Sequence, residues 1–264
     1  MKIMITGSEG FIGSHVTRKL EKENKILHFN ITDGQDVRDY ENVRKLMKGC
    51  NVVIHLAAAC KGRVDSVENP DEYFSTNVLG TFNILRSAVG NKVEKVIFAT
   101  TAHALTPKTP YDLSKLQAEQ WLRLFNKIYG IKAYALRFYH VYGEGERRGV
   151  VSSFIKKLKD GKEIDVFGDG NQTYDFVHVD DIANIVKMFV ENDYLVKDSF
   201  EIGTGRQTTI NQLVKIIAKE LNVKPKIKQL PPREIDLKQS FAENPFGHTK
   251  ISIENGIKNF IKNI

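Results

Sequence analysis

Short apolar runs alternate with longer amphipathic stretches along the first half of the chain. The strand-like runs are Lys2–Thr6, Lys25–Phe29, Asn51–Leu56, Val93–Thr100 and Ala133–Phe138, and helical patterns extend to Glu23 and cover Asp71–Ala88 and Tyr111–Tyr129. Asn51–Leu56 and Val93–Thr100 are almost continuously apolar, which is typical of parallel strands buried on both faces. The alternation predicts an α/β fold with a doubly wound parallel sheet.

Beyond Gly143 the pattern changes to shorter elements. Helices are predicted over Val150–Asp160, up to about Glu191, over Ile210–Leu221 and over Ile253–Ile261, with short strands at Ile164–Phe167, Phe176–Val179 and Phe200–Ile202. We therefore expect residues 1–145 to form a main domain, rejoined by about 176–202. Residues 146–175 and 203–264 are expected to form a small C-terminal α/β annex.

The composition is that of an ordinary globular protein, with 41% hydrophobic and 27% charged residues. The net charge of +7 comes from scattered lysines without interleaved aromatic residues, so we expect no nucleic-acid partner. No apolar run approaches the ~20 residues of a membrane span, and no membrane contact is expected. Cys50 and Cys60 have neither disulfide nor zinc spacing and the histidines are isolated, which predicts a reducing, cytoplasmic setting and no metal site.

A glycine-rich turn, Thr6–Gly13, joins the first predicted strand to the first helix. Gly7 permits a tight turn, Gly10 lets the backbone approach a pyrophosphate at the positive end of the helix, and Gly13 lets the helix pack closely on the strand. Three glycines alone are weak evidence, but this is the first turn of a chain that continues in βαβ order. The turn predicts a Rossmann-type domain that binds a dinucleotide. The residues expected to contact it here are Gly7, Gly10, Phe11, Ile12 and Gly13.

The residue expected to grip the adenosine ribose is unusual. An acidic side chain about 20 positions after the glycine turn commonly binds this ribose in NAD. This chain has Asn30 there, with Asp33 just beyond, and no Arg that would suit the 2′-phosphate of NADP. An amide can still bond a ribose hydroxyl, so NAD is favoured while NADP stays open. Further cofactor contacts are expected at the small or polar residues Asp36, Val37, Leu56, Ala57 and Ala58.

Tyr111 and Lys115 open a predicted helix, and their spacing places the phenol and the ammonium on one helix face. The pKa of a free tyrosine is about 10, too high for a base at neutral pH. An adjacent cation together with an oxidised nicotinamide would lower that pKa. Tyr111 is therefore a candidate general base and acid, and the alternative is a surface tyrosine beside a surface lysine.

Together these motifs resemble the extended short-chain dehydrogenase/reductase family, in its NAD-dependent nucleotide-sugar epimerase/dehydratase branch. The likeness covers nearly the whole chain, and its motifs stand in the family's order. The similar segments are Thr6–Val16, Asp36–Asp39, Val53–Ala58, Asn77–Thr81, Tyr111–Lys115, Leu136–Gly143, Phe167–Asp181 and Ile202–Gly205.

The resemblance implies hydride transfer between C4 of a hexose and C4 of nicotinamide, with Tyr111 exchanging the hydroxyl proton. It places at Thr101 the residue that hydrogen-bonds the reacting sugar oxygen. It assigns Lys115 to the nicotinamide ribose and Asn77 to the support of the cofactor site. It also implies a homodimer built on the two long helices.

The sequence departs from the family pattern on the substrate side. The Asp-Glu pair of the family's dehydratases is Ala102-His103 here, so a 4,6-dehydratase is not expected. The stretch from Thr101 to Tyr111 is also shorter than the corresponding loop of the family. The shorter stretch is expected to leave the active site more open or covered by a partner.

Two residues of the family's phosphate and sugar contacts are also replaced. The Arg that holds the nucleotide diphosphate is Tyr174, and the substrate-side Asn is His140. A phenol cannot reproduce the bidentate bond of Arg to phosphate, but Arg233 matches another phosphate-binding Arg of the family. The implied substrate contacts are Thr101, His103, His140, Tyr174 and Arg233.

The leading interpretation is an epimerase or 4-keto reductase that acts on a nucleotide-activated sugar. Two alternatives stay open because of the shortened loop and the replaced phosphate contact. One is a regulatory protein that binds the dinucleotide without turnover. The other is an NAD(P)-dependent dehydrogenase whose substrate carries no nucleotide.

Overall fold

The computed structural model describes residues 1–194 and 197–263. The chain divides into two compact units, and each is assembled from two stretches of sequence. Unit 1 comprises Met1–Phe138 and Ala183–Phe200, and unit 2 comprises Tyr139–Ile182 and Glu201–Ile264. The sequence analysis predicts the corresponding boundaries at residues 145, 176 and 202. Both divisions make the main domain discontinuous.

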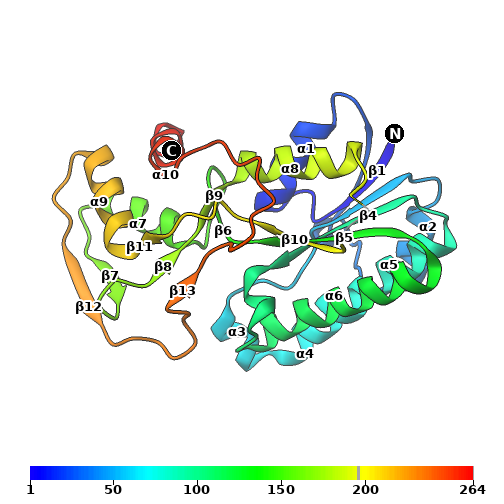
Figure 1. Cartoon of the computed structure of the whole chain (residues 1–264), viewed down its shortest axis with the longest axis horizontal. Coiled ribbons are helices and arrows are strands. Elements are labelled where there is room, and N and C mark those ends of the chain that lie inside the picture. The colour runs from blue at the N-terminus through cyan, green and yellow to red at the C-terminus, as the bar shows by residue number, and fades with distance from the viewer. Residues whose placement is uncertain (195–196, 264) are drawn as a thin grey trace. The chain divides into compact units, whose positions relative to one another are not determined.

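A six-stranded sheet forms the centre of unit 1 (Figure 1). In spatial order the strands are β10 (Ser199–Ile202), β5 (Lys132–Phe138), β4 (Lys95–Thr101), β3 (Val52–His55), β1 (Lys2–Thr6) and β2 (Lys25–Phe29). The neighbouring pairs from β5 to β2 are all parallel. Every residue of β3 is buried, as the predicted apolar strand requires.

The strand order reverses between β1 and β3. From β1 the chain passes to β2 on one side, and β3 then pairs with β1 on the other side. In open α/β sheets, ligands bind beyond the carboxyl ends of the strands at such a reversal. The glycine turn follows β1 and Leu56–Ala58 follows β3, so both expected cofactor segments leave the sheet at this point.

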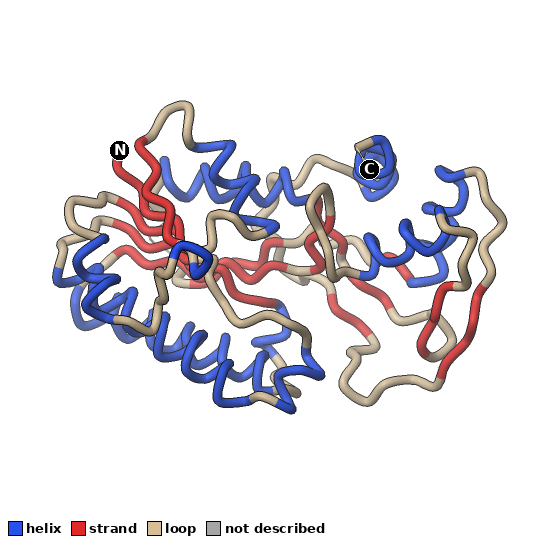
Figure 2. The backbone as a smooth tube through the Cα atoms, turned by 180° about the vertical axis from the view of Figure 1, so that it is seen from behind, coloured by secondary structure: helices blue, strands red, loops and turns tan. Residues whose placement is uncertain are grey.

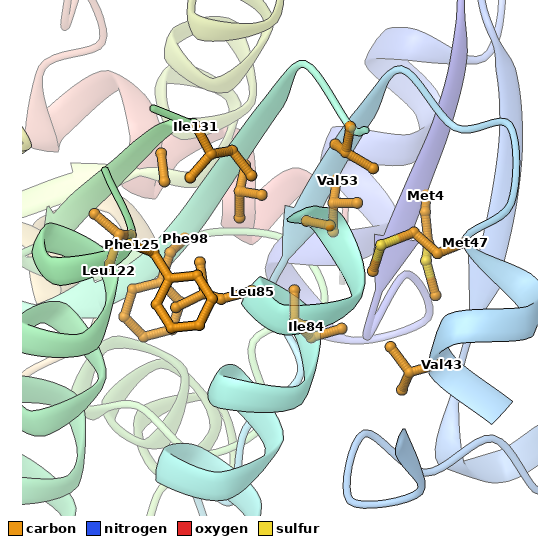
Figure 3. Packing of buried hydrophobic residues seen from close by; sticks show 14 of the residues in the cluster. Met4, Val43, Met47, Val53, Ile84, Leu85, Phe98, Leu122, Phe125 and Ile131 are labelled. Atoms are coloured by element: carbon orange, nitrogen blue, oxygen red, sulfur yellow. The ribbon is translucent and has the colours of Figure 1, made fainter. Parts of the chain in front are cut away.

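Helices cover both faces of the sheet (Figure 1). One face carries α1 (Phe11–Leu20) and the part of α8 (Val179–Glu191) from residue 183 onward. The other face carries α5 (Gly80–Gly90) and α6 (Pro110–Tyr129). The helix α2 (Tyr40–Leu46) packs on α5. Figure 3 shows the buried apolar layer on the α5 and α6 face, which includes Met4, Val53, Ile84, Leu85, Phe98, Leu122 and Phe125. Burial of this layer is the main force that holds α6 against the sheet.

The stretch predicted as one helix over Asp71–Ala88 has three parts. The short helix α4 (Pro70–Tyr73), which follows α3 (Arg63–Glu68), runs into a π-helical segment, η2 (Phe74–Leu79), and then into α5. π-helical turns are rare and are often found at functional sites. Asn77 lies inside this one.

Unit 2 contains small sheets and three packed helices. β6 (His140–Tyr142) pairs with β9 (Phe176–His178), β7 (Ile164–Phe167) pairs with β12 (Ile227–Leu230), and β8 (Thr173–Tyr174) lies between β11 (Thr208–Thr209) and β13 (Gln239–Ser240). Figure 2 shows these short strands in red among the loops of this part of the chain. The helices α7 (Val150–Lys159), α9 (Ile210–Leu221) and α10 (Ile253–Lys262) contribute to one apolar core.

Four of the observed elements have the bounds that the sequence predicts. Lys2–Thr6, Lys25–Phe29, Ile164–Phe167 and Ile210–Leu221 have the predicted limits. The sequence analysis missed the elements α2, α3, β6, β8 and β11–β13, whose local sequences show no clear apolar period. In the parts of the chain described, no helix combines the length and the apolar character needed to cross a membrane.

Candidate active site

The glycine turn after β1 is too tight for side chains. Gly7 has a φ of +71°, and a Cβ atom there would lie 3.0 Å from the Ala57 nitrogen. A Cβ at Gly13 would come within 2.0 Å of the Gly7 carbonyl oxygen, because the first turn of α1 rests on the loop. The Gly7 amide donates to the Phe29 carbonyl at 2.8 Å, which fixes the turn to β2.

The N-terminus of α1 is open to an anion. Gly10 is the N-cap, no side chain caps the helix, and the first turn carries no acidic residue. The first amides of a helix have no partner within it, and they carry positive partial charge. Phe11 and Ile12 follow as half-buried residues. The Cβ-free cradle and the uncapped helix therefore fit the pyrophosphate of a dinucleotide.

Asn30 holds the glycine turn and a neighbouring carboxylate. Its Oδ1 accepts from Ser8 Oγ at 3.1 Å and from the Glu9 amide at 3.2 Å. Its Nδ2 donates to Asp33 Oδ2 at 3.3 Å. Asn30 therefore links the Asp33 carboxylate to the glycine turn.

The two other predicted cofactor segments are well anchored. Val37 is buried, and Asn83 Nδ2 donates to the Val37 carbonyl at 3.1 Å. Asp36 accepts two bonds from Arg38 Nε, at 2.8 and 3.0 Å, and this pairing lowers the pKa of the Asp36 carboxyl. After β3, the Ala57 amide donates to Thr6 Oγ1 at 3.1 Å, and Leu56 and Ala58 are half-buried.

A chain of buried hydrogen bonds runs from β1 to the π-helical segment. Thr6 Oγ1 lies 2.7 Å from His55 Nδ1, and His55 Nε2 lies 3.0 Å from Thr81 Oγ1. The Thr81 hydroxyl donates its proton to the Asn77 carbonyl at 2.6 Å, so His55 Nε2 must be the donor to Thr81. Burial, reinforced by the charge of Lys115, lowers the pKa of His55 to about 3, and the ring is neutral.

Asn77 links the segment after β3 to the start of α6. Its Oδ1 accepts from the Ala59 amide at 2.8 Å. Its Nδ2 donates to the Ala59 carbonyl at 3.1 Å and to Ser114 Oγ at 3.0 Å. The structure therefore places Asn77 as a support, with its amide occupied by protein partners.

Tyr111 lies in the first turn of α6, next to a segment that other contacts hold in place. A capping box between Thr109 and Asp112 fixes the start of the helix. The Tyr73 ring meets the Tyr111 ring edge to face, with centroids 6.0 Å apart. Tyr73 Oη also accepts from the Lys61 amide at 3.2 Å, so residue 60 is held beside Tyr111.

The phenol of Tyr111 is not a base in the protein alone. Burial raises the pKa of Tyr111 above its ordinary value, and the electrostatic influence of the neighbouring Cys60 and Asp112 raises it further. A positive charge close to the phenol has the opposite effect. Loss of the proton near neutral pH therefore requires additional positive charge in the site.

Lys115 lies one turn further along α6 and is buried at 4% exposure. Its Nζ donates to the Ala99 carbonyl at 3.0 Å and lies 4.8 Å from the centre of the Phe98 ring. Burial lowers the pKa of Lys115 to about 8, and the nearby Cys60 and Glu119 act against this shift. The lysine is therefore protonated at neutral pH.

Thr101 stands at the end of β4, where its Oγ1 accepts from the His103 amide at 3.3 Å. The short helix η3 (Ala102–Leu105) begins there and leads toward α6. Since α6 packs on both β4 and η3, Thr101, Tyr111 and Lys115 come from adjoining elements of unit 1. The predicted cofactor residues belong to the same unit.

The predicted substrate residues of unit 2 are His140, Tyr174 and Arg233, and each of them contacts other residues of this unit. The rings of His140 and Tyr174 are stacked at an angle with centroids 4.4 Å apart, so the two departures from the family pattern lie against each other. Tyr174 is 9% exposed, and its hydroxyl donates to the Leu237 carbonyl at 3.5 Å. Arg233 lies 4.2 Å from the centre of the Phe167 ring and donates to Asp236 at 2.8 and 3.0 Å.

Sequence reasoning missed two residues near Tyr111 and Lys115. Glu119 follows Lys115 by one helical turn, and this spacing was the available signal. Cys60 carried no such signal, because its place beside Tyr111 depends on the fold of the segment after β3. Within residues 1–194 and 197–263, no group of three or more His, Cys, Asp or Glu side chains is arranged to hold a metal ion.

Comparison with known proteins agrees with this geometry. The family model for the NAD dependent epimerase/dehydratase family matches residues 3–203. A protein of Methanocaldococcus jannaschii described as a putative UDP-glucose 4-epimerase is 35% identical, over 99% of this chain and 98% of its own length. The crystal structure of Thermotoga maritima UDP-glucose 4-epimerase with UDP-glucose has a TM-score of 0.91 and 30% identity, covering 99% of this chain and 98% of that one.

A third similar structure is the Thermus thermophilus UDP-glucose 4-epimerase complex with NAD, with a TM-score of 0.89 and 26% identity over 99% of this chain and 98% of that one. The chain belongs to the NAD-dependent epimerase/dehydratase family and is an enzyme of the extended short-chain dehydrogenase/reductase type. NAD is the cofactor of this family, and the glycine cradle fits it.

Proposed function

We propose that the protein is a 4-epimerase of a nucleotide-activated sugar. The observation that carries the proposal is that one unit holds both the dinucleotide cradle and the complete set Thr101, Tyr111 and Lys115. NAD, when bound, supplies the reversible removal of a hydride from C4 of the sugar. In unit 2, Arg233, which suits a phosphate, and the pair His140 and Tyr174 are the candidate substrate residues.

The chain's own residues move the proton. Tyr111 takes the proton of the sugar 4-hydroxyl as a general base and returns it as a general acid. Lys115 lowers the pKa of Tyr111 through its charge and binds the nicotinamide ribose. Thr101 donates a hydrogen bond to the reacting oxygen, which stabilises the charge that develops there.

A 4-keto reductase is the second candidate, because it uses the same three residues. An epimerase returns the hydride to the same sugar, so it keeps its cofactor through many turnovers. A reductase consumes reducing equivalents and must exchange the cofactor. Retention of NAD therefore separates the two.

The test begins with denaturation of the purified protein and quantification of the nucleotide released. We expect about one NAD per chain, and stabilisation in a thermal-shift panel by a uridine, thymidine or guanosine diphosphate sugar, with UDP-glucose tested first. Bare nucleoside diphosphates and free sugars are the matched controls. A protein stabilised by dinucleotide and by no nucleotide sugar would contradict the proposal and favour a dehydrogenase of another substrate or a non-catalytic binding protein.

We also propose that the protein forms a homodimer through α6. This helix exposes one apolar stripe, with Leu113 46%, Trp121 38%, Leu124 42% and Ile128 59% exposed. Phe74 of the adjoining π-helical segment is 58% exposed. A symmetric pair of such faces would bury these side chains against their copies.

The double variant Leu124→Glu/Ile128→Glu is expected to be a monomer, because four charges would meet at the two-fold axis. Light scattering after size exclusion should give a mass of about 30.0 kDa for the variant and twice that for the unmodified protein. Ile31→Glu, at another exposed apolar position of unit 1, is the control and should stay dimeric. A monomeric unmodified protein would overturn the assignment.

A further inference from the structure

A buried carboxylate lies directly behind the reaction residues. Glu119 is 1% exposed on the face of α6 that packs against the sheet. Its Oε1 accepts from Thr100 Oγ1 at 2.9 Å. The Arg137 guanidinium donates to the same carboxylate, through Nε at 3.1 and 3.2 Å and through Nη2 at 2.6 Å.

The three partners come from three different elements. Thr100 of β4 and Arg137 of β5 are directly opposite each other in the parallel register, so their side chains leave the same face of the sheet. Glu119 of α6 binds both. One carboxylate therefore joins two strand ends to the helix, and hydrogen bonds to charged groups of this kind are shorter and stronger than neutral ones.

Two members of this network, Thr100 and Glu119, are adjacent to reaction residues. Thr100 directly precedes Thr101, and Ala99, on its other side, accepts the bond from Lys115 Nζ at 3.0 Å. Glu119 follows Lys115 by one helical turn on the same face. A shift of α6 along the sheet would therefore displace Lys115 and break the bonds of Glu119 together.

The charge of Glu119 also acts on Lys115. The ammonium is buried and lies near Cys60 of the segment after β3, His55 of β3 and the Phe98 ring of β4. His55 is neutral, and Arg137 is a second cation on this side. Glu119 is thus the one carboxylate among these groups. Burial lowers the pKa of Lys115 because it favours the uncharged amine, and Cys60 and Glu119 oppose this shift.

We propose that Glu119 is a positioning residue for the reaction: it fixes Lys115 and Thr101 relative to one another by joining Thr100 and Arg137 to α6, and its negative charge acts on the Lys115 ammonium one helical turn away. The catalytic part of this proposal rests on the function proposed above. The protonation of Lys115 does not, because it can be measured without turnover.

The first test follows the titration of Lys115 by NMR in protein labelled with carbon-13 at lysine Cε, with Lys115→Arg to assign the signal. In Glu119→Gln, which keeps the size of the side chain, we expect the midpoint to fall by about one pH unit, a roughly tenfold loss of proton affinity. Arg123→Gln is the matched control, since Arg123 is exposed and lies 3.9 Å from the same carboxylate. It should leave the midpoint unchanged. An unchanged midpoint in Glu119→Gln would overturn the electrostatic role.

The second test separates position from charge through kinetics. Glu119→Gln should move the alkaline limb of the kcat profile to lower pH by the same amount. Thr100→Val removes one hydrogen bond and keeps the carboxylate, so we expect an unmoved limb and a kcat lower by about three- to tenfold at unchanged KM. A Thr100→Val enzyme with full kcat would overturn the positioning role. Failure of the proposed function has a different signature: the Lys115 midpoint shifts in Glu119→Gln, but the unmodified protein turns over no nucleotide sugar.

Discussion

Replacement of Tyr111 by Phe is expected to lower kcat by about 10²- to 10⁴-fold, the usual contribution of a general acid–base residue. The substitution removes one oxygen atom and keeps the ring that packs edge to face on Tyr73. The half-buried phenol is the group expected to exchange the sugar proton. Its removal leaves the dinucleotide cradle intact.

Steady-state kinetics and NAD content should be measured together on the same preparation. The variant should retain the bound NAD of the unmodified protein and still be stabilised by the nucleotide sugar. Tyr129→Phe, at the exposed end of the same helix, is the control and should keep full activity. More than a tenth of the original kcat in Tyr111→Phe would show that another group carries the proton.

His55 is expected to make unit 1 sensitive to acid. Its folded pKa of about 3 lies below the unfolded value of 6.5 because the ring is buried. Below pH 6.5 the unfolded chain binds a proton that the folded chain does not bind, so unfolding becomes more favourable as the pH falls. The stability is complete above pH 6.5, and it is lost at about 1.4 kcal/mol for each pH unit down to the folded pKa.

Urea unfolding at pH 7 and pH 4 measures this effect. His55 should account for a loss on the order of 3 kcal/mol over this range. His55→Gln should be less stable at pH 7, because one amide cannot reach both Thr6 and Thr81, but its stability should change less with pH. His248→Gln changes a surface histidine and should keep the original dependence. Equal pH dependence in His55→Gln and the unmodified protein would contradict the neutral, buried ring.

The local sequence predicted the parts of the fold whose periods are long. The strands that follow the glycine turn, and the long helix that begins at Tyr111, have apolar patterns of many residues, and their bounds were found closely. The π-helical segment around Asn77 was predicted as ordinary helix, since both conformations share nearly the same apolar pattern. The short strands of unit 2 exist because distant segments pair, which a local pattern cannot report.

In the candidate site, too, some residues could be predicted from the local sequence and others depend on distant contacts. The glycines were predictable because each solves a local steric problem, and Tyr111 and Lys115 because helical spacing places them on one face. The sequence did not predict the role of Asn30, because its hydrogen bond to the Asp33 carboxylate, three residues further on, is visible only in the structure. Cys60 could not be predicted, because its place beside Tyr111 depends on long-range contacts: Asn77 holds Ala59, and Tyr73 holds Lys61.

By itself, therefore, the sequence determined the α/β class and the dinucleotide turn, and it named Tyr111 and Lys115 as candidate reaction residues, since these depend on backbone sterics and on spacings of a few residues. The tertiary structure alone decided which charges are buried and what they face. It placed the tilted rings of His140 and Tyr174 in contact, and it brought Thr100, Arg137 and Glu119 together from two strands and a helix. Proton affinities inside a protein follow from burial and from distances between side chains far apart in the chain, and folding sets both.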